Sequence, residues 1–325
     1  MQTDLRGSNN ARQQCFSLER TVLTNLVPGP NLRPTGDLSN KTVNIQNHES
    51  APGSPDGPDG DAGSGGVEIG ERVGGAPTVS VIIPTRNEAL NLPYVAERMP
   101  SVDEIVVIDG GSVDDTVAVA RKLWPQAKVL SQTRSGKGNA LACGFEVATG
   151  DILVMIDADG STDPAEIPAF VATLIGGADL AKGSRFSHGG GSDDITAFRR
   201  LGNLGFNWLV NRIFATEFTD LCYGYNAFWR HVLDTLDLPD TAGTAAQWGD
   251  GFEIETIINV RIARSGLLIR EVGSFEACRI HGRSNLNAFS DGFRVLRTIN
   301  RERRLHKAPG LADTLAQPRQ LAGRK

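Results

Sequence analysis

Short apolar runs alternate with helical segments along residues 78–185, and this alternation limits the chain to the α/β class. The runs are rich in β-branched residues, as expected for strands buried in a parallel sheet. The predicted strands are 78–84, 104–112, 152–160, 179–185 and, later, 267–272. The predicted helices are 88–98, 113–123, 138–148, 164–175, 196–215 and 251–265. This order predicts βαβ units with right-handed crossovers, and so a mostly parallel central sheet flanked by helices.

Polar residues follow each of the first four predicted strands. The clusters are Pro84-Thr85-Arg86-Asn87-Glu88, Asp109-Gly110-Gly111-Ser112, Asp157-Ala158-Asp159 and Gly183-Ser184-Arg185. The carboxyl ends of parallel strands lie at one edge of the sheet, where open α/β sheets bind ligands. We therefore expect the four clusters to converge on one cleft.

Asp157 and Asp159 are the strongest metal-binding candidates. They lie two residues apart, just after a buried strand, so both can reach one hard divalent cation. Mg²⁺ and Mn²⁺ favour oxygen ligands, and Mg²⁺ is commonly bound by one or two carboxylates together with substrate phosphate oxygens. The alternative is an ordinary turn that caps the helix beginning at residue 164.

Three other strand-end or turn residues suit a nucleotide. Asp109 could accept hydrogen bonds from a base or ribose, or interact with the dipole of the following helix. Lys137, in a Gly-Lys-Gly turn, could offer an ammonium and nearby backbone N–H groups to phosphate, although a solvated turn is the alternative. The turn lacks P-loop spacing. Arg185 could neutralise a diphosphate leaving group, or form a surface ion pair.

Candidates for the acceptor side lie farther along the chain. Asp220 and Glu255 are possible general bases, with N-terminal helix acidity as the alternative for Glu255. Arg279 and Arg283 belong to a cationic loop suited to an anionic acceptor. His281 has no partner at metal-ligand spacing.

Composition argues against several other classes. The net charge of −5 does not suggest a nucleic-acid partner. The four cysteines form no CxxC pair, which argues against a zinc site and favours a reducing cytoplasm. No apolar run is long enough for a membrane span, and residues 1–20 lack the apolar segment of a signal peptide.

The ends of the chain differ from its centre. Residues 51–66 are almost entirely Gly, Pro, Asp, Ala and Ser, so we predict a disordered tail over 1–76 and one domain over 77–285. Residues 286–305 predict an Arg-rich amphipathic helix, followed by a flexible tail over 306–325. One face of this helix carries Leu286, Phe289, Phe293 and Leu296, and the adjacent face carries Arg294, Arg297, Arg301 and Arg304. The helix suits either peripheral contact with the inner face of a membrane or packing on its own domain.

Eight motifs in order resemble family 2 glycosyltransferases: VSVIIPTRNE, EIVVIDGGSVDDT, GKGNAL, GDILVMIDADGSTDP, KGSR, TDLCYGYNAF, GFEIET and the later EV…R..G.SN. Within that family the chain most resembles the dolichol-phosphate mannosyltransferase and polyprenyl-phosphate glycosyltransferase branch. The resemblance covers about residues 78–287.

The resemblance implies a GT-A fold, similar to nucleotide-diphospho-sugar transferases, and inversion at the anomeric carbon. It places Pro84, Arg86 and Glu88 in the nucleotide pocket and Asp109 on the base or ribose. Asp157, Ala158 and Asp159 would line the Mg²⁺ or Mn²⁺ and diphosphate site, with Arg185 on the phosphates. The acceptor side would contain Asp220, Glu255, Arg279 and Arg283.

Five residues depart from the family pattern. Gly110 replaces an aspartate, Arg86 stands where tyrosine is frequent, and Asn285 stands where lysine is frequent. Gly160-Ser161 follows the DxD motif in place of a Leu-Gln or Leu-Ser pair. These changes weaken the inference of a third metal contact and of a lipid-phosphate acceptor.

The sequence thus predicts an enzyme that transfers a hexose from a GDP- or UDP-sugar to an acceptor, with a polyprenyl phosphate as the first choice. A soluble or polysaccharide hydroxyl is the alternative acceptor. A nucleotidyltransferase is disfavoured because PTRNE, rather than a glycine-rich basic loop, follows the first strand. An inactive sugar-nucleotide-binding module is disfavoured by the retained DAD and GSR motifs.

Overall fold

The computed structural model describes residues 75–283 and 288–307. The tails predicted over 1–76 and 306–325 lie almost entirely outside these residues, as do Leu286 and Asn285. Residues 76–283 and 288–307 belong to one compact unit.

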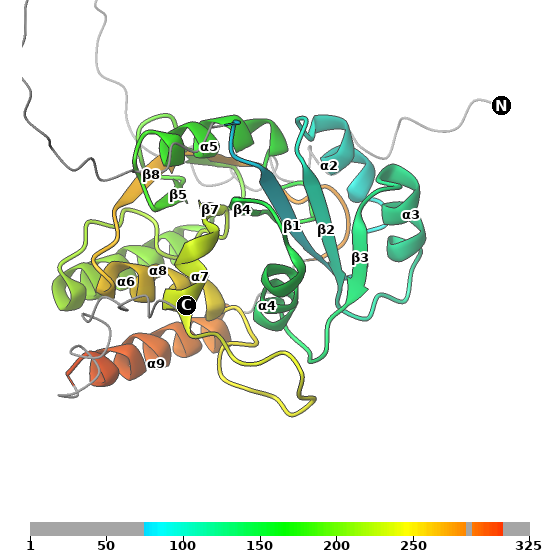
Figure 1. Cartoon of the computed structure of the whole chain (residues 1–325). Coiled ribbons are helices and arrows are strands. Elements are labelled where there is room, and N and C mark those ends of the chain that lie inside the picture. The colour runs from blue at the N-terminus through cyan, green and yellow to red at the C-terminus, as the bar shows by residue number, and fades with distance from the viewer. Residues whose placement is uncertain (1–74, 284–287, 308–325) are drawn as a thin grey trace, which may run out of the picture. The chain divides into compact units, whose positions relative to one another are not determined.

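A seven-stranded sheet forms the centre of this unit, in the order β3-β2-β1-β4-β7-β5-β8 (Figure 1). The strands are β1 Val79–Thr85, β2 Glu104–Asp109, β3 Lys128–Ser131, β4 Ile152–Met155, β5 Leu180–Ser184, β7 Asn226–Trp229 and β8 Ile269–Gly273. Every strand pair in this sheet is parallel except the two that β7 makes with β4 and β5. The predicted mostly parallel sheet is confirmed. The polar and aromatic segment 219–225 leads directly into β7.

Helices cover both faces of the sheet. One face carries α2 Leu92–Arg98, α3 Thr116–Leu123 and α5 Ile167–Ile175, which follows the 3-10 turn η1 Pro164–Glu166. The other carries α4 Lys137–Val147, α7 Leu233–Leu236, with η2 Arg230–Val232 before it, and α8 Ile254–Arg264. Neighbouring residues of β1 serve different layers, because Val81 and Ile83 pack in the first core and Ile82 in the second. Both cores hold the sheet edge in place for the site.

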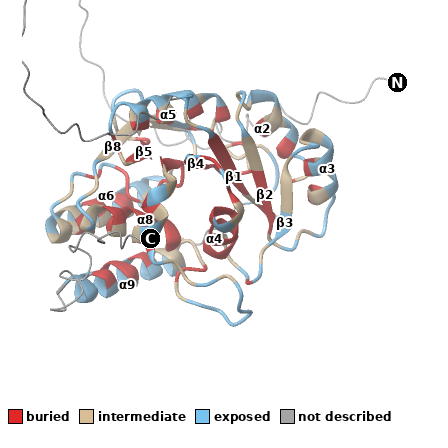
Figure 2. Cartoon of the chain, viewed as in Figure 1, coloured by how far each residue is buried: buried red, intermediate tan, exposed pale blue. Residues whose placement is uncertain are grey.

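Two long helices form a third packed group with α8. These are α6 Ala197–Phe214 and α9 Ala288–Lys307, whose shared core contains Val210, Val295 and Ile299. A short ribbon pairs β6 Gly191–Ser192 with β9 Phe275–Glu276. Figure 2 shows buried residues on the side of α9 that faces the domain and exposed residues on its outer side.

Several predicted boundaries were wrong by a few residues. The helix predicted from residue 88 begins at Leu92, because residues 88–91 form a turn in which Asn91 and Leu92 N–H groups donate to the Glu88 carbonyl. The strand predicted over 152–160 ends at Met155, so Asp157 and Asp159 lie in the loop after it. The helix predicted over 286–305 extends to Lys307.

Candidate active site

A cavity of about 1040 Å³ lies at the carboxyl edge of the sheet. Its lining includes Pro84 near the end of β1 and residues that follow five strands: Arg86 and Glu88, then Gly110, Gln132, Asp157 to Asp159, and Arg185. Residues from α4, α6, α8, α9 and the 276–282 segment complete it. The four polar clusters therefore meet at one edge, as the strand order requires.

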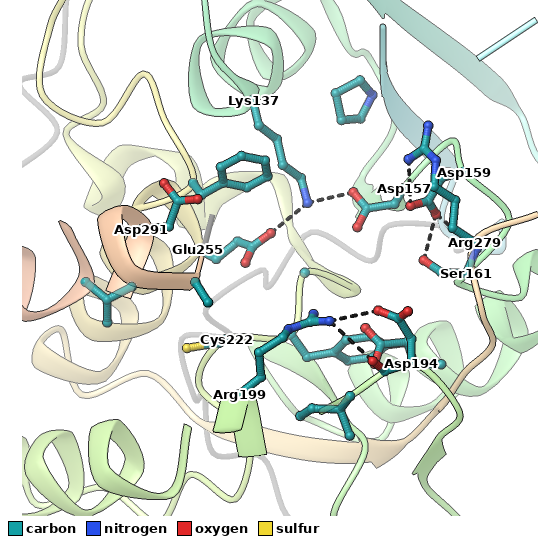
Figure 3. Close-up of a pocket in the computed structure, with 18 of the residues that line it drawn as sticks. Lys137, Asp157, Asp159, Ser161, Asp194, Arg199, Cys222, Glu255, Arg279 and Asp291 are labelled. Carbon is teal, nitrogen blue, oxygen red and sulfur yellow. Dashed lines mark hydrogen bonds and ion pairs between the residues drawn. The ribbon is translucent and has the colours of Figure 1, made fainter. Parts of the chain in front are cut away.

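The loop after β4 presents two carboxylates to the cavity (Figure 3). One Asp159 oxygen accepts hydrogen bonds from the backbone N–H and hydroxyl of Ser161, at 3.0 and 2.7 Å. Its other oxygen lies 3.1 Å from Arg279 Nη1. Asp157 is 2.6 Å from the Lys137 ammonium. Both carboxylates are thus fixed in direction and already face a cation.

Lys137 lies between two carboxylates at the start of α4. Its Nζ is 2.6 Å from Asp157 and 2.7 Å from Glu255 (Figure 3). Gly224 leaves room for this contact, since a Cβ there would lie 2.4 Å from Glu255 Oε1 and 2.9 Å from the ammonium. The side chain thereby links the metal-candidate loop to α8.

The backbone of the Gly-Lys-Gly turn does not serve the cavity. The N–H groups of Gly138 and Asn139 donate to the Asp250 carbonyl, at 2.8 and 3.2 Å. The prediction that these amides bind phosphate was therefore wrong, because the chain packs too closely here. A Cβ on Gly138 would lie 1.8 Å from the Gly249 carbonyl oxygen. What the turn delivers to the cavity is the Lys137 ammonium.

Burial and ion pairing set the charges of this group. Burial disfavours the ammonium of Lys137, but Asp157 and Glu255 outweigh it and raise the lysine pKa above its usual value. Burial also raises the pKa of Glu255, and the nearby ammonium only partly opposes this. Lys137 is therefore a permanent cation at neutral pH, while Glu255 holds its proton more tightly than an exposed glutamate.

Arg279 forms the second bridge across the cavity. Its guanidinium contacts Asp159 and Glu88, and its Nε donates to the His281 carbonyl at 2.7 Å. Burial raises the pKa of Glu88, although hydrogen bonds from Arg279 and Asn91 oppose the shift. The arginine thus ties the 276–282 segment to the loops after β1 and β4.

A separate buried cluster surrounds Arg185. Asp220 accepts hydrogen bonds from Arg185 Nε at 2.7 Å and Nη2 at 2.9 Å, and Glu276 accepts from Nη1 at 3.0 and 3.1 Å. Burial disfavours the guanidinium, but these carboxylates keep the arginine pKa above its usual value. Arg185 still lines the cavity, yet its donors are already engaged by protein carboxylates rather than turned to a diphosphate.

Three predicted site residues are not brought into the cavity. Within the described part of the chain, Asp109, Asp220 and Arg283 are missing from the cavity lining. Asp109 accepts from the N–H groups of Gly111 and Ser112, both at 3.1 Å, and so shapes its own turn. Asp220 is fully buried, and its second partner is the Asn203 side chain at 3.0 Å. Arg283 is exposed.

The opposite end of the cavity is apolar. Phe198 and Phe206 of α6 and Phe289, Phe293 and Leu296 of α9 line it. The rings of Phe198 and Phe289 lie 5.1 Å apart and join the two helices. Arg199, paired with Asp194 at 2.8 Å, also lines the cavity (Figure 3). The contribution of α6 to the cavity was not predicted from the sequence, although its Phe and Leu residues at helical spacing indicated an apolar face.

The Asp157 and Asp159 carboxylates would supply only part of the ligand shell of a divalent cation. No group of three His, Cys, Asp or Glu suited to a metal occurs in the ranges 75–283 and 288–307. The two loop carboxylates supply oxygen ligands of the kind that Mg²⁺ and Mn²⁺ take. A cation at Asp157 and Asp159 would therefore complete its shell with water and with oxygens of a bound diphosphate.

Comparison with known proteins identifies the family. Residues 80–237 match the family model described as "Glycosyl transferase family 2". The chain carries a family 2 glycosyltransferase domain. The sequence resemblance is thereby confirmed.

Two curated relatives illustrate the range of this family. An uncharacterized glycosyltransferase of Mycobacterium tuberculosis is 41% identical over 107 residues, covering 33% of this chain and 48% of the relative. A polyprenol monophosphomannose synthase of Mycolicibacterium smegmatis is 36% identical over 170 residues, covering 49% and 64%. The chain thus spans about half to two-thirds of the length of these relatives.

A solved structure supports the fold. Glucosyl-3-phosphoglycerate synthase from Mycobacterium tuberculosis, in complex with Mn²⁺, UDP-glucose and phosphoglyceric acid, superposes with a TM-score of 0.55. It is 24% identical, and the match covers 70% of this chain and 80% of that one. The family 2 domain therefore has the predicted GT-A fold. None of the helices in the described residues is long and apolar enough to cross a membrane.

Proposed function

We propose that this family 2 domain transfers a hexose from a nucleoside diphosphate sugar to a polyprenyl phosphate, with inversion, at the inner face of a membrane. One observation carries the proposal: a single cavity joins an end built from carboxylates and cations to an end built from aromatic and aliphatic side chains. A lipid phosphate has the same two chemical parts. The relative named as a polyprenol monophosphomannose synthase agrees with this acceptor.

The donor would occupy the charged end. Pro84, Arg86 and Glu88 line the wall beside β1, and Asp157, Ala158 and Asp159 line the floor after β4. Bound Mg²⁺ or Mn²⁺, held by Asp157 and Asp159, would supply charge compensation for the diphosphate. Lys137 is the resident cation nearest to that position, 2.6 Å from Asp157.

The transfer needs stabilisation of the leaving group rather than a covalent intermediate. An acceptor oxygen forms a bond to the anomeric carbon while the carbon–oxygen bond to the diphosphate breaks, and its electron pair leaves with the diphosphate. Fixed cations stabilise the developing negative charge because they need no reorientation during the reaction. Lys137 and Arg279 are held by carboxylates on both sides, so they meet this requirement.

An anionic acceptor explains the remaining features of the cavity. A phosphate oxygen is already a nucleophile and requires no general base. Arg279 and Arg199 line the same cavity as the carboxylates and the apolar residues, and they would offer cations to a phosphate attached to a lipid. Arg283, exposed on the same segment, would then act at the entrance.

Incubation with labelled donors tests the proposal. The purified chain is mixed with radiolabelled GDP- and UDP-sugars, with Mn²⁺ or EDTA, and with or without polyprenyl phosphate. The expected result is label in the organic phase only when the lipid and Mn²⁺ are both present. Label transferred only to a soluble acceptor would overturn the lipid acceptor, and intact donor in every mixture would overturn the transferase.

Glu255 supports a second candidate, transfer to a hydroxyl. Its carboxylate lines the cavity, and burial raises its pKa toward the range useful for a general base. Asp220, the other predicted base, is fully buried against Arg185 and Asn203. Of the two predicted bases, only Glu255 is therefore placed to serve a hydroxyl acceptor.

A further inference from the structure

Helix α6 has asparagines on the face that packs on the domain and large apolar residues on the face exposed to solvent. Its inward face carries Asn203, Asn207 and Asn211, whose amides donate to Asp220 Oδ1, the Thr219 carbonyl and the Phe218 carbonyl. Their side-chain oxygens accept from the N–H groups of Cys222, Leu221 and Phe218. The outward residues Phe198, Leu201, Leu204 and Trp208 are 51% to 69% exposed. The inward face of α6 thus combines asparagines with Val210, whereas its outward face exposes two Leu, one Phe and one Trp, as expected for a face that meets an apolar environment.

Helix α9 continues the same exposed surface. It packs on the domain through Val295, Thr298, Ile299 and Glu302, all buried. Phe289, Phe293 and Leu296 remain 77%, 67% and 44% exposed. The Phe198–Phe289 ring contact joins the two helices, so their exposed residues form one surface. We call this surface the outer apolar face: Phe198, Leu201, Leu204, Trp208, Phe289, Phe293 and Leu296.

Basic side chains border the outer apolar face. Helix α6 contains three arginines and no acidic residue. Helix α9 adds Arg294, Arg297, Arg301, Arg303 and Arg304, of which Arg297 and Arg301 stand over the Trp248 ring at 5.0 and 5.7 Å. The whole chain, by contrast, has a net charge of −5. Positive charge is therefore concentrated beside the exposed apolar side chains.

We infer that the outer apolar face of α6 and α9 docks the protein on an anionic lipid surface and places the apolar end of the cavity at the interface. Interfacial helices combine Trp, Phe and Leu with Arg in this way, and anionic headgroups attract the basic border. Phe198, Phe289, Phe293 and Leu296 belong both to this face and to the cavity lining. The inference rests on the proposed lipid acceptor only in explaining why the outer apolar face is continuous with the cavity.

The charges favour a lipid surface over a second copy of the chain. A two-fold dimer through this face would bring the same basic border of both copies together. Like charges across an interface are unfavourable. Anionic headgroups instead complement the arginines of both helices.

Vesicle sedimentation of the full chain tests the inference without donor or acceptor. Sucrose-loaded vesicles of phosphatidylcholine alone are compared with vesicles containing phosphatidylglycerol at one part in four. We expect binding to the anionic vesicles, and a loss of at least about tenfold in partitioning for the double variant Leu201→Ser, Trp208→Ser. Neither residue lines the cavity within the described chain. The variant Arg303→Gln, Arg304→Gln should lose the preference for anionic vesicles.

Matched controls show whether the loss of vesicle binding is specific to the outer apolar face or follows the removal of any exposed apolar side chain. Leu130→Ser with Ile175→Ser removes two apolar side chains that are 41% and 60% exposed on other elements, and should bind like the wild type. Asp159→Ala should also bind like the wild type, so failure of the proposed chemistry leaves this test intact. The inference is overturned if the Leu201/Trp208 variant binds vesicles as well as the Leu130/Ile175 control does, or if the wild type does not bind. A dimer in light scattering that only the Leu201/Trp208 variant dissociates would assign the face to a second copy and overturn it as well.

Discussion

Two groups of basic and acidic side chains lie at the carboxyl edge of the sheet, and they differ in their access to the cavity. In the first group, Lys137 and Arg279 bridge Asp157, Glu255, Asp159 and Glu88, and the Asp157 side chain is 33% exposed. In the second, Arg185 holds Asp220 and Glu276, and Asp220 is 0% exposed. We call the first the accessible group, because Asp157 and Asp159 are partly exposed, and the second the enclosed group, because Asp220 is fully buried although Arg185 and Glu276 still line the cavity.

This difference in access suggests that the accessible group binds ligands and that the enclosed group stabilises the fold. Carboxylates of the accessible group can exchange a protein cation for a metal or a substrate. The enclosed group cannot, because removal of one member would leave an uncompensated charge in the interior. Its role is to connect the strand end at Ser184 with the loop before β7 and with β9.

The largest expected effect is on catalysis, in the accessible group. Asp159→Ala should lower the transfer rate about 10³-fold or more, because it removes a carboxylate from the proposed metal and diphosphate site. Thermal unfolding should shift by no more than about 3 °C. The matched control is Asp115→Ala, an exposed helix N-cap that makes no side-chain cap bond. Transfer at the wild-type rate in the Asp159 variant would refute the site.

The next effect concerns stability, in the enclosed group. Arg185→Met should lower the free energy of unfolding by about 3–5 kcal/mol, because Asp220 and Glu276 lose their counter-charge inside the protein. Arg279→Met, in the accessible group, should cost less, about 2 kcal/mol, because its partner Asp159 is 20% exposed although Glu88 is buried. Urea denaturation of both variants measures the contrast. Equal losses would abolish the distinction between the two groups.

A carboxylate outside both groups shows what pairing alone contributes. Although burial opposes ionisation, hydrogen bonds from Lys128, Ser80 and Thr149 lower the pKa of Glu104 to about 2, from its ordinary value of 4.5. The stabilisation is therefore present above pH 4.5 and is lost as the pH falls toward 2. Because Lys128 is 41% exposed, we discount the effect to about 2 kcal/mol.

Glu104→Gln should therefore flatten the acid limb of a stability–pH curve. The measurement is urea denaturation at a series of pH values, with wild type and variant in parallel. A variant that keeps the full wild-type acid dependence would show that other groups cause it.

The smallest effect is expected at Glu255. If the acceptor is a phosphate, Glu255→Gln should lower the transfer rate less than about tenfold, because no proton has to be removed. If the acceptor is a hydroxyl, the loss should reach about 10²–10⁴-fold and the wild-type rate should fall as the pH drops through the raised pKa of Glu255. Rates measured from pH 5 to 8 decide between the acceptors.

Much of the fold was accessible from the sequence. Apolar runs with polar ends located β1, β2, β4 and β5, and the rule for parallel strands then placed their ends together. Strand β7 was missed, because NAFW is short and follows a polar and aromatic turn. Its antiparallel position depends on pairing with β4 and β5, which lie far from it in sequence.

The site was predictable in its location more than in its pairings. Asp157, Asp159, Lys137 and Glu255 were predicted because each lies at a strand end or helix start, and all four line the cavity. Sequence could not show that Asp220 is enclosed with Arg185, since burial depends on packing between distant segments. It also could not orient α6, because apolar spacing shows that a helix has two faces without showing which one turns inward.

The asparagines of α6 have a mechanical consequence. Apolar helix contacts permit small sliding movements, but three amides bonded to one loop fix both the rotation and the position of this helix. Residues 218–222 would therefore move with α6 as one rigid piece, and Tyr223, the next residue, forms part of the cavity wall. A displacement of α6 from its outer side would therefore also displace the cavity wall at Tyr223.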